Sequence, residues 1–253
     1  MPLEIVTIPC LSDNYAFLAR DPGSGRVALI DVPEADPILA ELAARGWSLD
    51  EIWITHHHWD HVQGLAEVLK AHAAPVTGAA DDAHRLPPLD RAVSDGDSFA
   101  FGETQIQVWD VSGHTVGHIA FIGGGAAFTA DSLMALGCGR VFEGTHSQMH
   151  RSLEKFKALP RETIVCSGHE YTAANGAFAV TVDPANPALA KRIADTAAAR
   201  AAGTPTVPSV LGLELDTNPY LRADDPGIAE ALGMPGAAPV DVFSEIRTRK
   251  DNF

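Results

Sequence analysis

The chain has 253 residues, and its 18 basic and 33 acidic side chains give a formal net charge of −15 at pH 7. This acidic balance argues against a nucleic-acid partner, because neutralising phosphates requires a broad basic surface. Gly, Pro or charged residues interrupt every apolar stretch before it reaches the roughly 20 residues of a membrane-spanning helix, so no membrane association is expected. The three cysteines form no C-x-x-C pair and are widely spaced, which argues against a disulfide framework and favours a reducing, cytoplasmic location.

Apolar periodicity predicts short strands and a few helices. Apolar runs bounded by Gly, Pro, Asn and Asp predict the strands, and apolar residues at helical spacing predict the helices. The strands are expected at residues 3–8, 15–20, 26–31, 52–54, 99–101, 105–109, 119–122, 126–129 and 163–166. The helices are expected at 36–45, where Gly46 supplies the stop, and at 62–72, 147–159 and 187–202.

The composition changes after Tyr171, where the sequence becomes rich in Ala and is punctuated by Pro. A strand-rich body with interspersed helices, followed by a helical tail, predicts an α/β fold with two β-layers flanked by helices and a small C-terminal α-helical domain. We therefore expect two domains, 1–172 and 173–253. No coiled-coil seam or exposed apolar helix is evident, so a monomer is expected.

One segment, Thr-His-His-His-Trp-Asp-His at residues 55–61, follows the predicted strand 52–54. A strand end that opens into a loop lets closely spaced side chains converge, and imidazole with carboxylate suits Zn, Fe and related ions. A single histidine in such a place is more often packed or solvated than bound to metal. Four candidate ligands are more than one open tetrahedral ion requires, which favours two ions. His57 and Trp59 are not among these candidates, and their side chains are expected to point outward or to pack. The candidate ligands are His56, His58, Asp60 and His61.

Ligand-type residues recur at three later strand ends. His114 lies in the run Ser-Gly-His-Thr-Val-Gly-His, and Asp131 and His169 each follow a predicted strand. Each histidine alone could belong to the core, and the aspartate could cap a turn. Their recurrence at successive strand ends indicates one site gathered at one edge of a layered fold, where Gly113 and Gly168 let the backbone approach closely.

The motifs T-H-x-H-x-D-H, G-H-T-x-G-H, T-A-D-S and S-G-H resemble those of the metallo-β-lactamase superfamily. Within it, the chain resembles the glyoxalase II (hydroxyacylglutathione hydrolase) family over nearly its full length. The metal motifs specify only the superfamily, whereas the segment around Arg140 and the ending Arg-Thr-Arg-Lys-Asp-Asn-Phe point to the family. The supporting segments are residues 11–15, 137–144, 168–172, 217–222 and 247–253.

The resemblance implies an αββα sandwich, with residues 1–172 as the catalytic domain and 173–253 as an α-helical substrate-binding domain. It also implies two divalent metal ions per chain, zinc foremost, with iron or manganese as alternatives. The first ion is expected at His56, His58 and His114. The second is expected at Asp60, His61 and His169, with Asp131 bridging the two. Asp60 has a second candidate role as the acceptor that orients a metal-bound hydroxide.

The resemblance further implies hydrolysis of S-(2-hydroxyacyl)glutathione thioesters, such as S-D-lactoylglutathione to D-lactate and glutathione, in methylglyoxal detoxification. Metal ions lower the pKa of bound water to about 7, so a bridging hydroxide is a nucleophile at neutral pH. The thiolate leaves without a strong general acid, because a thiol pKa is ~8.5. The carboxylates of this small-molecule substrate need cations, although a basic chain end is equally typical of a solubilising terminus. By resemblance, the residues that clamp the substrate are Arg140, Phe142, Tyr171, Arg247 and Lys250.

Three positions depart from the family pattern. Ala130 stands where Gly is usual, Ser112 where Pro is common, and Phe142 where some relatives carry Tyr. The first two bear on local backbone fit, and the third removes a hydroxyl contact to substrate. None of them removes a ligand.

The closest alternative function is that of a glutathione-persulfide dioxygenase with a single iron, which would not need Asp60, His61 and His169 as a second set of ligands. A lactonase or lactamase would not need the basic elements at Arg140 and Lys250. A metal-binding module without turnover is a further possibility that only an assay separates. The sequence lacks a Gly-x-Ser-x-Gly motif, and the cysteines at 138 and 166 are expected to be small buried residues rather than nucleophiles.

Overall fold

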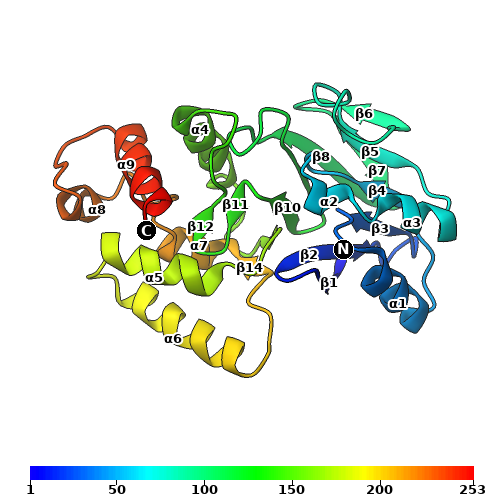
Figure 1. The fold of residues 1–253 in the computed structure, drawn as a ribbon, viewed down its shortest axis with the longest axis horizontal. Coiled ribbons are helices and arrows are strands. Elements are labelled where there is room, and N and C mark those ends of the chain that lie inside the picture. Colours follow the sequence, from blue (N-terminus) through cyan, green and yellow to red (C-terminus); the bar gives the residue numbers. More distant parts are fainter. The chain divides into compact units, whose positions relative to one another are not determined.

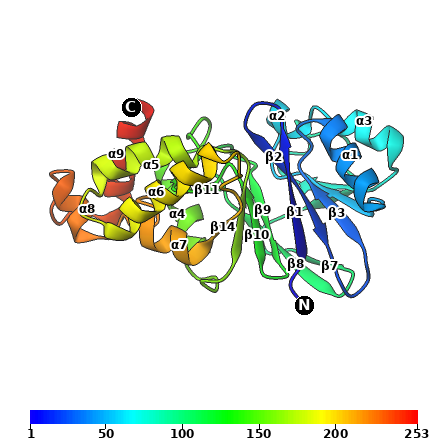
Figure 2. The same cartoon turned by 90° about the horizontal axis from the view of Figure 1, so that it is seen from below.

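A computed structural model describes residues 1–253 as two compact units (Figures 1 and 2). Unit 1 comprises Met1–Asp110 and Val116–Ala130, and unit 2 comprises Val111–Thr115 and Asp131–Phe253. The expected division after residue 172 stays a prediction.

The first sheet of unit 1 has the strand order β1-β2-β3-β4-β5-β6. Neighbours are antiparallel from β1 to β3 and parallel from β3 to β6. The strand Val-Ala-Leu-Ile of β3 is buried at every residue, as expected for a strand covered on both faces. The strands are β1 (Glu4–Cys10), β2 (Asn14–Arg20), β3 (Val27–Ile30), β4 (Glu51–Trp53), β5 (Val76–Ala79) and β6 (Arg91–Val93).

A second set of strands in unit 1 forms an antiparallel run in the order β10-β9-β8-β7. The strands are β7 (Ser98–Phe101), β8 (Thr104–Asp110), β9 (Ile119–Gly123) and β10 (Ala126–Ala130). Trp53 of β4 joins the two sheets, because its buried ring contacts Phe101 at 5.1 Å, Phe121 at 5.3 Å and Phe128 at 6.2 Å between ring centroids. The core of unit 1 is therefore the aromatic layer between its sheets.

The helices of unit 1 are α1 (Ala35–Arg45), α2 (Trp59–Val62) and α3 (Leu65–Ala71). Gly46 ends α1 as predicted, with a left-handed φ of 66°. The prediction of one helix over 62–72 is wrong at its start, because the chain breaks between α2 and α3. A Cβ on Gly64 would lie 2.9 Å from the backbone nitrogen of Ala35, and the Gly64 N–H donates to Val32 O, so this backbone docks on the neighbouring loop instead of continuing a helix.

Unit 2 contains two short antiparallel strand pairs and the remaining helices, and α5 and α6 run side by side in Figure 1. Thr145 and Gln148 form a capping box at the start of α4, and Asn186 with Pro187 starts α6. None of the helices combines the length and the apolar character needed to cross a bilayer. The elements are β11 (Leu133–Met134), β12 (Gly137–Cys138), α4 (His146–Phe156), β13 (Ile164–Ser167), α5 (Thr172–Val182), α6 (Pro187–Ala201), β14 (Ser209–Val210), α7 (Leu211–Thr217), α8 (Pro226–Ala231) and α9 (Pro239–Asp251).

Asp21, just after β2, ties the following loop to the turn between β7 and β8. Its buried carboxylate accepts hydrogen bonds from the Ser24 hydroxyl at 2.6 Å, the Glu103 N–H at 2.7 Å and the Thr104 hydroxyl at 3.2 Å. These donors, the Ser24 hydroxyl foremost, lower the pKa of Asp21 to about 2. The carboxylate therefore links strands of both sheets.

We expect Asp21→Ala to lower the free energy of unfolding by about 2–3 kcal/mol at pH 7, since the substitution strands several buried donors. Because the pKa of Asp21 is lowered on folding, this contribution is complete above the unfolded carboxyl pKa of about 3.9 and is lost as the pH falls through about 2. Urea unfolding of wild type and variant between pH 7 and pH 2 measures it, with the exposed Asp81→Ala as control. A difference that stays constant across that range would contradict the assignment.

Candidate metal centre

The carboxyl ends of the parallel strands β3 and β4 bring Asp31 and Thr55 together. Asp31 adopts a left-handed φ of 55°, and its N–H donates to Trp53 O at 3.0 Å. Its two carboxylate oxygens then accept from the Thr55 N–H at 2.9 Å and from the Thr55 hydroxyl at 2.8 Å. This exchange fixes the direction in which the chain leaves β4, and the next six residues carry the predicted ligands of unit 1.

The structure brings the four predicted ligands of unit 1 together. The ring centroid of His56 lies 4.8 Å from that of His58 and 4.2 Å from that of His61. His61 Nε2 lies 3.8 Å from a carboxylate oxygen of Asp60. His56 and His61 are fully buried, and the buried His118 ring stacks on His56 with centroids 4.5 Å apart.

Hydrogen bonds at Nδ1 set the tautomer of the two buried ligands. His61 Nδ1 lies 2.9 Å from Asp31 Oδ2, and a carboxylate only accepts, so Nδ1 carries the proton. The Thr55 hydroxyl donates its proton in a hydrogen bond to Asp31, so the Thr55 oxygen accepts from His56 Nδ1 at 3.0 Å. Both rings therefore keep the Nε2 lone pair for a metal ion, in the carboxylate–histidine arrangement typical of metal sites.

Two neighbours hold the rest of the loop. Asn14 of β2 donates its amide to Asp60 Oδ2 at 2.9 Å and to Asp60 O at 3.2 Å, which restrains that carboxylate. His57 Nδ1 lies 2.9 Å from Asp82, whose other oxygen accepts from Arg85. The prediction that His57 packs rather than joins the ligands is consistent with this contact.

Unit 2 gathers the other three predicted ligands around one carboxylate oxygen. Asp131 Oδ2 lies 3.4 Å from His114 Nε2 and 3.3 Å from His169 Nε2, and all three residues are buried. His114 Nδ1 lies 2.7 Å from Arg140 O, and a carbonyl only accepts, so the proton of a neutral ring is on Nδ1. The lone pair at Nε2 then faces a carboxylate lone pair.

That juxtaposition fits a divalent cation. Two facing lone pairs repel unless a proton or a cation lies between them. Ligand atoms about 2.0–2.2 Å from a tetrahedral ion lie about 3.4 Å from one another, which matches the two distances around Asp131 Oδ2. Imidazole and carboxylate together accept Zn, Fe or Mn, so the donor set fits the implied metal class without selecting one ion.

Three of the predicted substrate residues surround these ligands. Tyr171 stacks on His169 with ring centroids 4.7 Å apart, and Phe142 meets His114 edge-on at 5.3 Å. The Arg140 guanidinium lies 5.7 Å from the centroid of the Phe142 ring. Phe142, Tyr171 and the side chain of Arg140 are all exposed, so they present one aromatic and cationic surface to solvent.

Arg247 and Lys250, the other predicted substrate residues, lie near the end of α9. Arg247 is buried, and its guanidinium donates to Cys138 O at 3.0 Å and to Asp251 at 2.9 Å. Lys250 donates to Ala174 O at 3.1 Å, and burial together with the Arg247 charge lowers its pKa. Lys250 is thus the more accessible cation of the two, and the buried Arg247 guanidinium is paired with Asp251.

The three cysteines are free and buried, as expected for Cys138 and Cys166. Burial raises the pKa of the Cys138 thiol to about 11 and that of Cys10 to about 12. Burial also raises the pKa of Cys166. All three are thiols at neutral pH, so none has the thiolate character of a nucleophile.

Two family models match consecutive parts of the chain. The one described as metallo-β-lactamase superfamily matches residues 13–169, and the one described as hydroxyacylglutathione hydrolase C-terminus matches residues 170–253. A relative named hydroxyacylglutathione hydrolase from Ruegeria pomeroyi is 64% identical over the full length of both chains. The chain belongs to the hydroxyacylglutathione hydrolase family. Another relative of that name, from Jannaschia sp., is 61% identical over 99% of this chain and 98% of its own.

Solved structures agree with the fold of this family. The BLEG-1 B3 metallo-β-lactamase superposes with a TM-score of 0.67 over 86% of this chain and 99% of its own, at 19% identity, which shows a shared fold alone. TTHA1623, solved in a di-iron-bound form, has a TM-score of 0.63 and 25% identity over 86% of this chain and 100% of its own. The predicted metallo-β-lactamase fold with a C-terminal helical part is confirmed.

Sequence reasoning missed the residues that orient the predicted ligands. Asp31, Thr55 and Asn14 were not among the candidates, although each hydrogen-bonds to a ligand or to the residue that orients one. Asp31 also places an oxygen within 4.8 Å of ligand atoms of His56 and His61. Its oxygens already accept three hydrogen bonds, so we assign it as the orienting carboxylate rather than a ligand. Its position directly after a buried strand was the available signal.

We expect Asp31→Ala to weaken metal binding about 10–100-fold, because His61 loses the acceptor that fixes its tautomer. Metal retention during dialysis against graded chelator measures this. Asp50→Ala is the matched control, since Asp50 accepts a backbone hydrogen bond from Val27 at the opposite end of the same strand. Equal metal retention in the two variants would contradict the role assigned to Asp31.

Proposed function

We propose that the chain hydrolyses S-(2-hydroxyacyl)glutathione thioesters, with S-D-lactoylglutathione as the substrate that yields D-lactate and glutathione. The main support is the full-length similarity to relatives named hydroxyacylglutathione hydrolase. The metal motifs of the sequence also contain every predicted ligand residue. As a member of a hydrolase family the chain is an enzyme. The corresponding biological role is methylglyoxal detoxification, and a cytoplasmic location and a monomeric state stay predictions.

The proposed metal ligands divide into two sets. Support comes from the single family model over residues 13–169, which spans all seven residues. His56, His58 and His114 would hold one ion, and Asp60, His61 and His169 the other, with Asp131 bridging them. Zinc is the proposed metal, with iron or manganese as alternatives. When bound, such a pair of ions supplies a hydroxide nucleophile at neutral pH and an electrophile for the thioester carbonyl.

The protein side chains keep this set of donors in one protonation state. Asp31, Thr55 and the Arg140 carbonyl each hold a histidine proton on Nδ1, so Nε2 stays a ligand. Asn14 donates to Asp60 Oδ2 at 2.9 Å and so restrains this carboxylate, and the same oxygen lies 3.8 Å from His61 Nε2. No side chain has to act as a strong acid, because the thiolate of glutathione is a good leaving group.

The proposed glutathione site comprises Arg140, Phe142, Tyr171, Arg247 and Lys250. Arg140 reaches Asp251 only at 3.6 Å and is mostly exposed, and such surface ion pairs contribute ~0–1 kcal/mol. A substrate carboxylate can therefore replace Asp251 at little cost and gain a bidentate guanidinium contact. Lys250 adds a second cation, and Phe142 and Tyr171 offer aromatic faces to the substrate. Because residue 142 is Phe, the hydroxyl contact of a tyrosine at that position is absent.

The alternative, a glutathione-persulfide dioxygenase with one iron, is less well supported. It leaves Asp60, His61 and His169 without a shared function, and it does not account for the match of residues 170–253 to the hydrolase C-terminus. Oxygen uptake with glutathione persulfide would identify that activity.

We expect the purified protein to hydrolyse lactoylglutathione, followed by the loss of thioester absorbance, and chelator treatment to abolish the activity. Arg140→Ala should raise KM about tenfold with unchanged metal content, because a charged contact to substrate is lost. Arg151→Ala, an exposed arginine on α4, is the control and should leave KM unchanged. Absence of thioester hydrolysis by protein that carries its full complement of metal would overturn the proposed function.

A further inference from the structure

A β-hairpin in unit 2 lies between a proposed metal ligand and a proposed substrate residue. Its strands β11 and β12 pair Leu133 with Cys138 and Met134 with Gly137, so a two-residue turn connects them. Asp131 precedes the hairpin by two residues, and Arg140 follows it by two. Any shift of the hairpin therefore reaches both functional residues through short, direct stretches of backbone.

Leu136 anchors the tip of this hairpin in the helices of unit 2. Its side chain is buried with Ala179 of α5 and with Leu189 and Ile193 of α6. The residue adopts a left-handed φ of 56°, which a leucine rarely does. The apolar anchor explains why leucine, rather than glycine, occupies that turn position.

Side chains from three helices and the residue after α7 bind the hairpin backbone. Asn218 donates to Met134 O at 3.1 Å and to Gly137 O at 2.9 Å. Asn175 of α5 donates to Ala135 O at 3.0 Å, Glu214 of α7 accepts from Leu136 N at 2.9 Å, and Arg247 of α9 donates to Cys138 O at 3.0 Å. The five consecutive hairpin residues 134–138 thus each have a backbone group bound by one of these four side chains.

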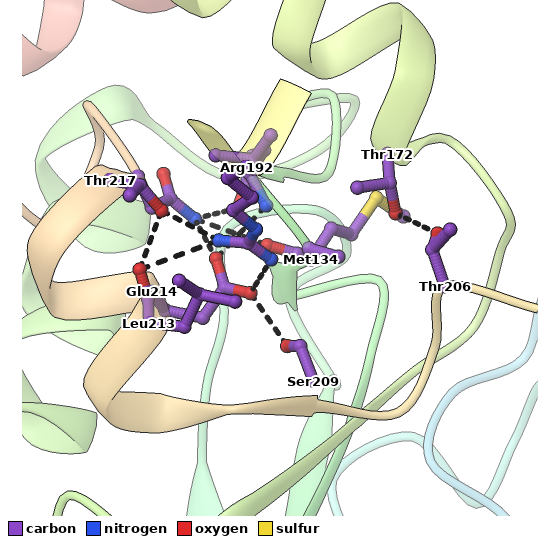
Figure 3. A network of polar contacts seen from close by, with 12 residues as sticks. Met134, Thr172, Arg192, Thr206, Ser209, Leu213, Glu214 and Thr217 are labelled. Atoms are coloured by element: carbon purple, nitrogen blue, oxygen red, sulfur yellow. Dashed lines mark hydrogen bonds and ion pairs between the residues drawn. The ribbon is translucent and has the colours of Figure 1, made fainter. Parts of the chain in front are cut away.

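A buried ion pair with Arg192 holds one of these side chains, Glu214, in place, as Figure 3 shows. Arg192 of α6 is bonded to Glu214, and its other nitrogen donates to the Thr217 hydroxyl at 2.7 Å. Ser209 donates to the same Glu214 oxygen at 2.6 Å, and Asn218 donates to the second oxygen at 3.2 Å. Glu214 is fully buried and Arg192 is 4% exposed, so the ion pair lies in a surrounding of low dielectric constant, where its hydrogen bonds are strong.

The base of the hairpin contacts the backbone next to two proposed ligands, Asp131 and His114. Gly139 N–H donates to Ser132 O at 3.2 Å, and a Cβ on Gly139 would lie 1.9 Å from Asp131 O. Arg140 O accepts from His114 Nδ1 at 2.7 Å. Moving the hairpin therefore moves the Asp131 backbone and the acceptor that fixes the His114 tautomer.

We propose that the network of Arg192, Glu214 and Asn218, with Asn175, positions Asp131, His114 and Arg140 through this hairpin. These are positioning residues, and the inference rests on the metal and substrate roles assigned in the proposed function. A buried ion pair is weak evidence for stability alone, since apolar replacements are often as stable. This ion pair holds a side chain that binds a backbone group of the hairpin, so we assign it the role of fixing the hairpin's position. The C-terminal helices then organise the metal ligands as well as contact the substrate.

The test compares three amide variants in the full-length, metal-loaded protein. Asn218→Ala removes both donors to the hairpin, and Asn175→Ala removes the independent one from α5. Asn186→Ala is the matched control, because Asn186 caps α6 and donates to Asp183 and Asp216 O without touching the hairpin. Each variant is measured for thermal unfolding, for metal retention during dialysis against chelator, and for KM and kcat.

We expect metal retention to fall about 10–100-fold in Asn218→Ala and Asn175→Ala, and to stay within twofold of wild type in Asn186→Ala at a comparable drop in Tm. KM should rise and kcat should fall only in the two hairpin variants. If Asn218→Ala does not fold, Asn175→Ala, which removes a single hydrogen bond to the hairpin, decides the test against Asn186→Ala.

Metal retention equal to that of Asn186→Ala in both hairpin variants would overturn the positioning role. Chelator resistance is measured without thioester, so it also separates this inference from the proposed function. If the hairpin variants lose metal but the wild-type protein does not hydrolyse thioester, the proposed function is wrong and the proposed positioning role still holds.

Discussion

The hydrogen bonds at Nδ1 of three buried histidines, all predicted ligands, are the constraint on which the rest of the proposed site depends. A neutral imidazole offers one lone pair, and the protein has to choose which nitrogen keeps it. Asp31 makes that choice for His61, Thr55 for His56 and the Arg140 carbonyl for His114. These acceptors come from a strand end, a loop and the exit of a hairpin, so the site requires that distant segments be correctly placed.

Left-handed backbone at non-glycine residues marks these same segments. Leu11, Asp31, Ala130 and Leu136 have φ values between 40° and 56°, a conformation that costs ~1–2 kcal/mol for an ordinary residue. Asp31 orients the predicted ligand His61, Ala130 precedes the predicted ligand Asp131, and Leu136 forms the tip of the hairpin that follows Asp131. Ala130 stands where the family usually has Gly, and its φ of 40° gives the physical reason for that preference. Strain of this kind persists where the surrounding structure holds it in place.

Much of the fold could be predicted from local sequence, because β3 is a continuous apolar run and α1 has helical periodicity and ends at a glycine. The break at Gly64 could not, since it results from contact with a loop about thirty residues earlier. The clustering of the candidate ligands could be expected because their residue types recur at strand ends, and their binding of metal stays a prediction. Asp31 and Asn218 were not, because their roles consist of hydrogen bonds to groups 30 to 84 residues away. Charge alone also did not reveal that Arg247 is buried and that Lys250 is the more accessible cation of the two.

Anomalous diffraction from crystals of the metal-loaded protein, recorded on both sides of the metal absorption edge, tests the central claim most directly. The account predicts two anomalous peaks per chain, with His56, His61 and His114 bound through Nε2 while Nδ1 keeps its acceptor. A single peak at full occupancy, or coordination through Nδ1 of any of these rings, would contradict it.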